Sequence, residues 1–215
     1  MTYLQAVNRV LTKLREDTVT TVNANIYSKL IGQLVNDALQ QIEAAYNWES
    51  LRVNQTATTT IGNKSITVTG AKQNSTVSWL VCQENNVFLK YKPKAWMENV
   101  YENMGAVTGS PVYYTFNGVD ALGDLKVDVY PMPDSAYNIR CEVVKRTEEL
   151  INDYDTILVP HYPVIQLAYA LAIRERGEAG GETVNEQILV AKSALNDAIQ
   201  LASERRPEEL VWQVN

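Results

Sequence analysis

Residues 25–42, NIYSKLIGQLVNDALQQI, carry the pattern that decides the fold of this chain. Apolar residues recur there at helical spacing, which places them on one face of a helix. A stripe this wide is typical of a helix that packs against a core. Asn25 stands just before the stripe, where its side chain can cap the first helical turn. The members of the stripe are Ile26, Leu30, Leu34, Val35, Ala38, Leu39 and Ile42.

Helical patterns of the same kind stand at both ends of the chain. Near the N-terminus, apolar residues at helical spacing predict a short first helix. Near the C-terminus, residues 164–173 are strongly apolar, and Pro163 suits the first turn of a helix. A last helical stripe follows the pair Gly180-Gly181. We expect the helices of the two ends to pack together as one bundle. The first stripe contains Leu4, Val7, Leu11 and Leu14, and the last contains Val184, Ile188, Ala191, Leu195, Ala198, Ile199 and Ala202.

Between these helical ends, from residue 53 to about residue 146, the sequence is typical of β-strands. Residues 56–60 and 65–69 flank the turn signal Gly62-Asn63-Lys64, which predicts a hairpin. Short connections between the last three predicted strands favour an antiparallel meander. The other predicted elements are strands at 77–81, 87–91, 112–116, 125–130 and 137–145, and a short helix at 95–101.

The sequence therefore predicts an α+β fold, in which a bundle of N- and C-terminal helices joins a central, antiparallel β-rich lobe. Residues 1–52 supply the N-terminal helices, residues 53–150 the β-rich lobe, and residues 151–206 the C-terminal helices. Pro207 ends the last helix, because proline cannot continue the backbone hydrogen-bond ladder. Residues 207–215 remain as a tail that is too short to form a core.

Composition places the 215-residue chain among globular proteins, with 46% hydrophobic and 20% charged residues. The chain has 25 acidic and 19 basic residues, a net charge of -6. This charge disfavours tight, general binding of nucleic acid, because domains that bind phosphates are usually basic. The two cysteines, Cys82 and Cys141, make no disulfide framework, so we expect synthesis in a reducing cytoplasm. No signal peptide and no apolar run of ~20 residues is found, so no membrane partner is expected.

The search for reactive groups finds no marked catalytic residue. The single histidine, His161, has no marked serine or cysteine partner, and a structural role beside a helix start is favoured. Residues 105–110, GAVTGS, lack the lysine of a phosphate-binding loop and are interpreted as a flexible loop. Asp120 and Asp124 fall in a glycine-containing stretch that fits a hairpin tip better than a calcium loop. We therefore expect no catalytic residues, no metal and no cofactor.

Three lysines near the middle of the chain leave two interpretations open. Lys90, Lys92 and Lys94 alternate with other residues, which on a strand places all three on one face. They can form a small patch that faces phosphate or DNA. They can equally form a lysine-rich edge strand that resists unwanted pairing, and this second interpretation is favoured.

A series of stretches, in the same order along the chain, resembles head-to-tail adaptor proteins of short-tailed bacteriophages, the tail tubular protein A type. None of these stretches is a catalytic signature, but together they cover most of the chain. They are residues 11–17, 27–31, 35–38, 46–48, 114–118, 123–131, 167–172, 174–178 and 209–212.

The resemblance implies a structural protein in the neck or tail of a virion. It implies self-association into a dodecameric ring under the portal protein, and this ring would join the portal to the tail nozzle or tail tube. Genomic DNA would pass through the channel of the ring without sequence-specific binding. Two other functions stay open: a phage-associated cell-wall hydrolase with acidic residues of the β lobe as catalysts, and a small ligand-binding β module.

Two sets of residues are candidates for contacts with partners. The tail after Pro207 carries apolar side chains, and aromatic anchors dominate many interfaces. We expect the tail to dock on a neighbouring subunit or on the portal, with folding back onto its own helices as the alternative. Loops on a rigid scaffold commonly carry binding, so β-lobe loops are expected to face the next tail component. The candidates are Leu210, Val211, Trp212 and Val214 in the tail, and Ala106, Val107, Thr108, Gly109, Ser110, Asn117, Gly118 and Gly123 in the loops.

Overall fold

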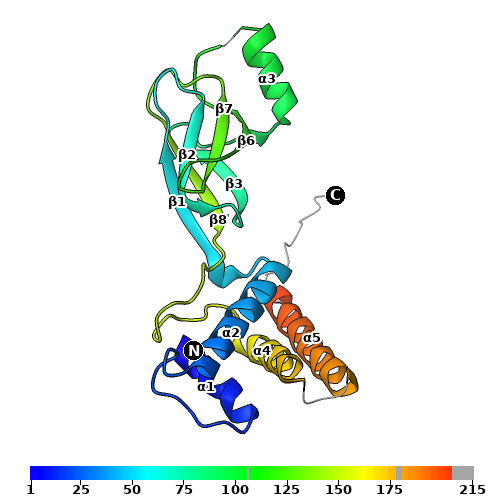
Figure 1. The fold of residues 1–215 in the computed structure, drawn as a ribbon. Helices are drawn as coiled ribbons and strands as arrows, with labels where there is room; N and C mark the ends of the chain where they lie inside the picture. The colour runs from blue at the N-terminus through cyan, green and yellow to red at the C-terminus, as the bar shows by residue number, and fades with distance from the viewer. Residues whose placement is uncertain (106, 178–180, 205–215) are drawn as a thin grey trace, which may run out of the picture. The chain divides into compact units, whose positions relative to one another are not determined.

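The computed structural model describes residues 1–105, 107–177 and 181–204. The chain divides into two compact units. The helical unit contains residues 1–50 and the chain from residue 147 onward, and the β unit contains residues 51–146. Figure 1 shows helices from both ends of the chain gathered in one unit and the central strands in the other. The predicted α+β class, with terminal helices and a central β-rich lobe, is confirmed.

The first two helices, α1 (Tyr3–Lys13) and α2 (Ile26–Ala45), begin where the sequence offers caps. The N–H of Ser28 donates to the Asn25 side chain, and the N–H of Asn25 donates to the Ser28 hydroxyl. This reciprocal capping box fixes the start of α2. Ile26 differs from the prediction, because it is 88% exposed. The buried face of α2 is centred instead on Ile31, Val35, Ala38, Leu39 and Ile42.

Helix α4 (His161–Arg176) contacts α1, α2 and α5 (Gly181–Glu204). Because α4 has neighbours on several sides, most of its first three turns is buried, and residues 164–173 form a nearly continuous apolar run. Pro163 lies in the first turn, as predicted. Gly177 ends the helix in the left-handed conformation, which glycine adopts without a Cβ penalty.

The segment that leads into α4, residues 147–160, is fastened to α2. The buried Glu43 carboxylate accepts hydrogen bonds from the N–H of Thr147 at 2.7 Å and from its hydroxyl at 2.6 Å. The Asn36 side chain exchanges two hydrogen bonds with the backbone of Leu150, at 3.0 and 3.1 Å. Buried polar groups that are satisfied in this way fix a single path for the chain.

The β unit contains two sheets of four strands, in the orders β1-β8-β3-β4 and β2-β7-β6-β5. Neighbouring strands are antiparallel except β5 and β6, which are parallel. A short 3-10 helix, Glu49–Leu51, precedes the first strand. The strands are β1 (Arg52–Thr58), β2 (Ser65–Lys72), β3 (Thr76–Cys82), β4 (Val87–Phe88), β5 (Lys90–Tyr91), β6 (Tyr113–Val119), β7 (Asp124–Tyr130) and β8 (Asn138–Val144).

The predicted hairpin between residues 56–60 and 65–69 is wrong. Strand β1 pairs with β8, and β2 pairs with β7, so the two strands belong to different sheets. The intervening residues 59–64 carry the chain from one sheet to the other. Alternation of polar and apolar residues shows that each strand has one buried face, but it does not show which strand lies beside it.

The predicted meander is correct only for its first two strands. Strands β6 and β7 form a hairpin, whereas β8 crosses to the other sheet. The single strand predicted at 87–91 is also divided at Leu89. Its first part, β4, pairs with β3, and its second part, β5, pairs with β6 in the other sheet.

The core of the β unit contains apolar side chains from both sheets. Helix α3 (Lys94–Asn103) packs on β6, with Met97 and Val100 buried and Trp96 against Tyr113. The apolar alternation of the strands therefore builds a two-sheet core, with α3 against one of the sheets. The core residues are Ala57, Ile66, Val68, Ala71, Leu80, Cys82, Leu89, Tyr114, Val127, Val129, Ile139, Cys141 and Val143.

Candidate functional site

The β unit has two distinct ends. The chain enters at Leu51 and leaves at Arg146, and the N–H of Lys145 donates to the Leu51 carbonyl oxygen at 2.8 Å. We call this the junction end. Because β1 and β8 run antiparallel from there, Thr58 and Asn138 lie at the opposite end, the far end. Four connecting segments meet at the far end: residues 59–64, 83–86, 104–112 and 131–137.

The predicted loop residues Val107, Thr108, Gly109 and Ser110 lie at the far end, and Ala106 lies outside the described residues. Their backbone is tied to the segment after β7. The N–H of Met132 donates to Val107 at 2.9 Å, and the N–H of Gly109 donates to Met132 at 2.9 Å. The Asn85 side chain donates to the Ser110 hydroxyl. The prediction of a flexible loop is therefore wrong for residues 107–110, because hydrogen bonds to neighbouring segments hold them.

The other far-end segments are also held together by hydrogen bonds. The N–H of Gly62 donates to the Pro133 carbonyl oxygen at 2.9 Å. Thr59 and Tyr137 exchange two bonds, because the N–H of Thr59 donates to the Tyr137 carbonyl and the N–H of Tyr137 donates to the Thr59 hydroxyl. These bonds link residues 59–64 to residues 131–137. The far end is therefore a set of loops on a rigid scaffold, the arrangement that commonly carries binding.

An ionised carboxylate takes part in this scaffold. Both oxygens of Glu84 accept the N–H of Asn138, at 2.9 and 3.0 Å. This backbone hydrogen bond is the main reason why the pKa of Glu84 is lower than usual. Glu84 therefore stays ionised to a lower pH than an ordinary glutamate, and it ties the loop after β3 to the start of β8.

Large apolar side chains project from the far end into solvent. Ile61 is 68% exposed, Met104 is 73% exposed and Val107 is 56% exposed. Scattered apolar residues on a surface are ordinary, but Ile61 and Val107 stand on loops whose backbone is held by hydrogen bonds, and Met104 is the C-cap of α3. Such side chains can dock on a partner at little cost in loop ordering. The far end is therefore the candidate binding surface of the β unit.

The remaining predicted loop residues, Asn117, Gly118 and Gly123, lie at the opposite end. The prediction that Asn117 and Gly118 are loop residues is wrong, because both lie inside strand β6. Only Gly123 lies in the turn between β6 and β7. Strand β6 is seven residues long, so roughly 20 Å separates this hairpin from the 107–110 loop. The structure therefore does not bring the two predicted loops together.

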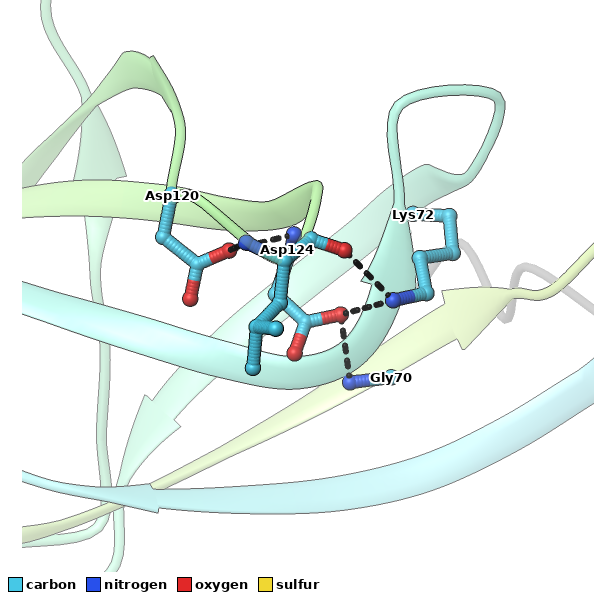
Figure 2. Close-up of polar contacts among 5 residues, drawn as sticks. Gly70, Lys72, Asp120 and Asp124 are labelled. Carbon is cyan, nitrogen blue, oxygen red and sulfur yellow. Dashed lines mark hydrogen bonds and ion pairs between the residues drawn. The ribbon is translucent and has the colours of Figure 1, made fainter.

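The hairpin tip is built by two carboxylates (Figure 2). One oxygen of Asp120 accepts the N–H groups of Leu122 and Asp124, both at 2.8 Å. One oxygen of Asp124 accepts the N–H of Gly70 and pairs with the Lys72 ammonium, both at 3.1 Å. Lys72 also donates to the Leu122 carbonyl at 2.8 Å. The prediction of a hairpin tip is confirmed, and the acidic pair serves to shape the tip.

Other residues considered for chemistry are dispersed. His161 is exposed in the first turn of α4. Cys82 and Cys141 are both completely buried, and burial raises the pKa of the Cys141 thiol to about 11. Among the described residues, no group of three or more His, Cys, Asp or Glu side chains could hold a metal ion.

One of the three lysines, Lys90, lies in an edge strand, and the other two follow it. Strand β5 lies at the edge of its sheet, but it contains only Lys90 and Tyr91, and Lys94 is the first residue of α3. The prediction that one strand face carries all three lysines is therefore wrong. The Lys92 ammonium lies over the rings of Trp96 and Tyr113, at 5.2 and 5.3 Å from their centroids. Lys94 donates to the Asn117 side chain at 2.7 Å. At least two of the three charges are thus used in contacts that hold α3 and β6.

Three far-end residues were not predicted from the sequence: Ile61, Met104 and Glu84. Ile61 does carry a signal, because it is an isolated large apolar residue next to the turn Gly62-Asn63. The role of Glu84 depends on β8, which is far away in sequence, and no local pattern announces it. Leu210, Val211, Trp212 and Val214 lie outside the described residues.

A family match can now be set beside this geometry. None of the helices that the structure describes is long and apolar enough to span a bilayer. No curated protein matches the chain. The family model described as SU10 adaptor protein matches residues 1–212, nearly the whole sequence. This match agrees with the resemblance to head-to-tail adaptors, which also covers most of the chain. The chain therefore belongs to the SU10 adaptor protein family and is a structural adaptor protein of a bacteriophage virion.

Proposed function

We propose that this protein forms a dodecameric ring in the neck of a short-tailed phage, between the portal protein and the tail nozzle or tail tube. The family match over residues 1–212 is the observation that carries this proposal. The resemblance to the tail tubular protein A type supplies the ring and its partners. The protein is synthesised in the host cytoplasm and acts without catalysis, cofactor or metal.

The two units have different tasks in this proposal. The helical unit builds the ring and contacts the portal, because it offers several helix surfaces that can pack against neighbours. The far-end loops of the β unit contact the next tail component, and their exposed apolar residues on fixed backbone support this role. Asn117, Gly118 and Gly123 lie away from the far end. The predicted contact of these residues with the tail component would therefore require a second binding surface, toward the junction end.

The C-terminal tail has a separate task. We propose that Leu210, Val211, Trp212 and Val214 dock on a neighbouring subunit or on the portal, with Trp212 as the anchor. Burial of each large apolar side chain is worth about 1.5–3 kcal/mol, which favours an occupied position for the tail. Folding back onto its own helices is the alternative.

Genomic DNA passes through the channel of the ring without sequence-specific binding. The net charge of -6 supports this role, because a wall with excess negative charge does not retain phosphates.

Light scattering on purified protein, with and without portal-bearing heads, tests the proposal. Adaptors that closed into rings before a head was full would form empty rings. We therefore expect mostly monomer in dilute solution, and rings only on portal-bearing heads. Stable dodecamers of the isolated protein at micromolar concentration would contradict this assembly order, and no binding to portal-bearing heads would contradict the function.

A further inference from the structure

The helical unit presents an acidic loop that carries exposed apolar side chains. Residues 148–158 contain four acidic residues, Glu148, Glu149, Asp153 and Asp155, and no basic residue. The apolar side chains on the same loop are exposed: Ile151 is 72% exposed, Tyr154 is 84% exposed and Leu158 is 52% exposed. We call residues 148–158 the acidic loop.

The acidic loop is held in one conformation by hydrogen bonds. One oxygen of Asp155 accepts the N–H groups of Ile151 and Asn152, at 2.8 and 2.7 Å, so the loop is closed on itself. The N–H of Tyr3 donates to the Asp155 carbonyl at 2.8 Å, which ties the loop to α1. Ile151 and Tyr154 are therefore presented on a backbone that is ordered before any partner binds, which reduces the entropic cost of docking.

A groove of complementary character lies on the same unit. A hollow of about 300 Å³ is lined by α2, α4 and α5. Its apolar lining includes Leu171, Ala191 and Leu195. Its only charged lining residues among those described are Arg174 and Lys192, and both are exposed and basic. We call this hollow the helical groove. An apolar floor with a basic rim matches the apolar tips and acidic charge of the loop.

The acidic loop and the helical groove lie on different flanks of the helical unit. Asn36 of α2 holds the loop through Leu150, whereas Gln41 of α2 lines the groove. Five residues along an α-helix turn through about 500°, which leaves the two side chains about 140° apart around α2. Figure 1 agrees, with α1 and α5 on opposite sides of α2 and α4. One copy therefore cannot fill its own groove with its own acidic loop.

We propose that the acidic loop of one copy docks in the helical groove of the next copy, an inference that rests on the ring proposed above. Two different complementary surfaces on one protomer make a heterologous, head-to-tail contact, and such contacts generate rings when the rotation closes. Ile151, Tyr154 and Leu158 contact the apolar lining of the groove. Glu148 and Glu149 face Arg174 and Lys192 of the neighbour.

Engineered cysteines test the contact directly. The variant Tyr154→Cys/Lys192→Cys, assembled on portal-bearing heads, is treated with a bismaleimide. The natural Cys82 and Cys141 are buried and do not compete. We expect a ladder of cross-linked products at successive multiples of the 24.1 kDa chain, because each copy links to two neighbours. The single variants Tyr154→Cys and Lys192→Cys are controls and should give no ladder.

Charge reversal supplies an independent readout. Arg174→Glu/Lys192→Glu should lower ring assembly on heads at least tenfold, and adding Glu148→Lys/Glu149→Lys should restore it. The matched reversal Arg9→Glu/Lys29→Glu places the same charge change outside both surfaces and should assemble normally. Thermal melting of each monomer checks that the fold is intact.

Failure of the proposed contact and failure of the ring itself would give different results. Rings that form on heads while the cysteine pair gives no ladder would overturn the contact and leave the ring intact. Cross-linking of Tyr154→Cys to the portal instead of to a second copy would overturn it as well. If the unmodified protein forms no multimer on heads, the ring itself fails, and the inference fails with it.

Discussion

At the scale of single residues, Tyr3 in the first turn of α1 makes the stability of the protein depend on pH. Its ring is 5% exposed, and its hydroxyl accepts a hydrogen bond from the Asn36 amide at 3.4 Å. Burial raises the pKa of Tyr3 from 10.0 to about 12, with smaller contributions from the charges of Glu149 and Asp153. Protonated Tyr3 is therefore favoured in the folded state.

This shift predicts a loss of stability in alkali. The unfolded chain releases the Tyr3 proton near pH 10, whereas the folded protein holds it until about pH 12. The stabilisation from Tyr3 is thus complete below pH 10 and is lost as the pH rises from 10 to 12, by roughly 2–3 kcal/mol. Denaturant unfolding at several pH values measures it. Tyr3→Phe should lose less stability over this range, and equal losses in the two proteins would contradict the assignment.

At the scale of elements, the contact between α1 and α2 depends on a glycine. A Cβ atom on Gly32 would lie 2.5 Å from the Tyr3 hydroxyl oxygen and 2.8 Å from a methyl carbon of Val22. Overpacking of this kind costs about 1–3 kcal/mol, which equals or exceeds the ~1 kcal/mol that alanine gains over glycine in a helix.

We therefore predict that Gly32→Ala destabilises the protein. The free energy of unfolding should fall by up to about 2 kcal/mol, the difference between the cost of overpacking and the gain in helix propensity. Gln33→Ala, on the exposed side of the same turn, is the matched control and should leave stability unchanged or slightly higher. An increase in stability for Gly32→Ala would show that α1 can move away from α2 without penalty.

The loops of the β unit give a second prediction at this scale. Ile61→Ser/Val107→Ser removes two exposed apolar side chains from the far end, so the protein should fold and form rings on portal-bearing heads. Attachment of the next tail component should fall at least tenfold, as expected for the loss of interface anchors. Leu122→Ser changes an equally exposed residue at the junction end and is the control. Electron microscopy of the particles counts attached tails, and normal tails on the double variant would contradict the far-end assignment.

Helices were more predictable than strand partners because their determinants are local. The capping pair Asn25 and Ser28 and the stripe through Ile42 are contained in one short stretch, so α2 could be predicted from residues 25–42 alone. The strand at 65–69 was recognised equally well, but its partner β7 lies about sixty residues later in the chain. No alternation pattern encodes such a distant neighbour.

One part of the candidate site could likewise be predicted from the local sequence, and another part could not. The hairpin tip at residues 120–123 was predictable, because glycines and carboxylates at turn spacing have local consequences. The far end was not predictable as a surface, because residues 59–64, 104–112 and 131–137 meet there only through the pairing of distant strands.

At the scale of the whole molecule, the chain forms two separate units. The helical unit is made from both chain ends, so the N-terminal and C-terminal helices must both be present before it can form. The β unit is one continuous insertion, residues 51–146, with its own core. Under the proposed function, this separation puts the contact with the tail component on the β unit and the contacts with neighbouring subunits on the helical unit.

The measurement that tests the central claim most directly is a cryo-electron microscopy reconstruction of necks from particles that contain this protein. The proposal predicts a dodecameric ring of this chain, with the portal on one side and the tail nozzle or tube on the other. The helical units should contact each other and the portal, and the far ends of the β units should contact the tail. A neck without this chain, or with this chain in a position that does not touch the portal, would contradict the proposal.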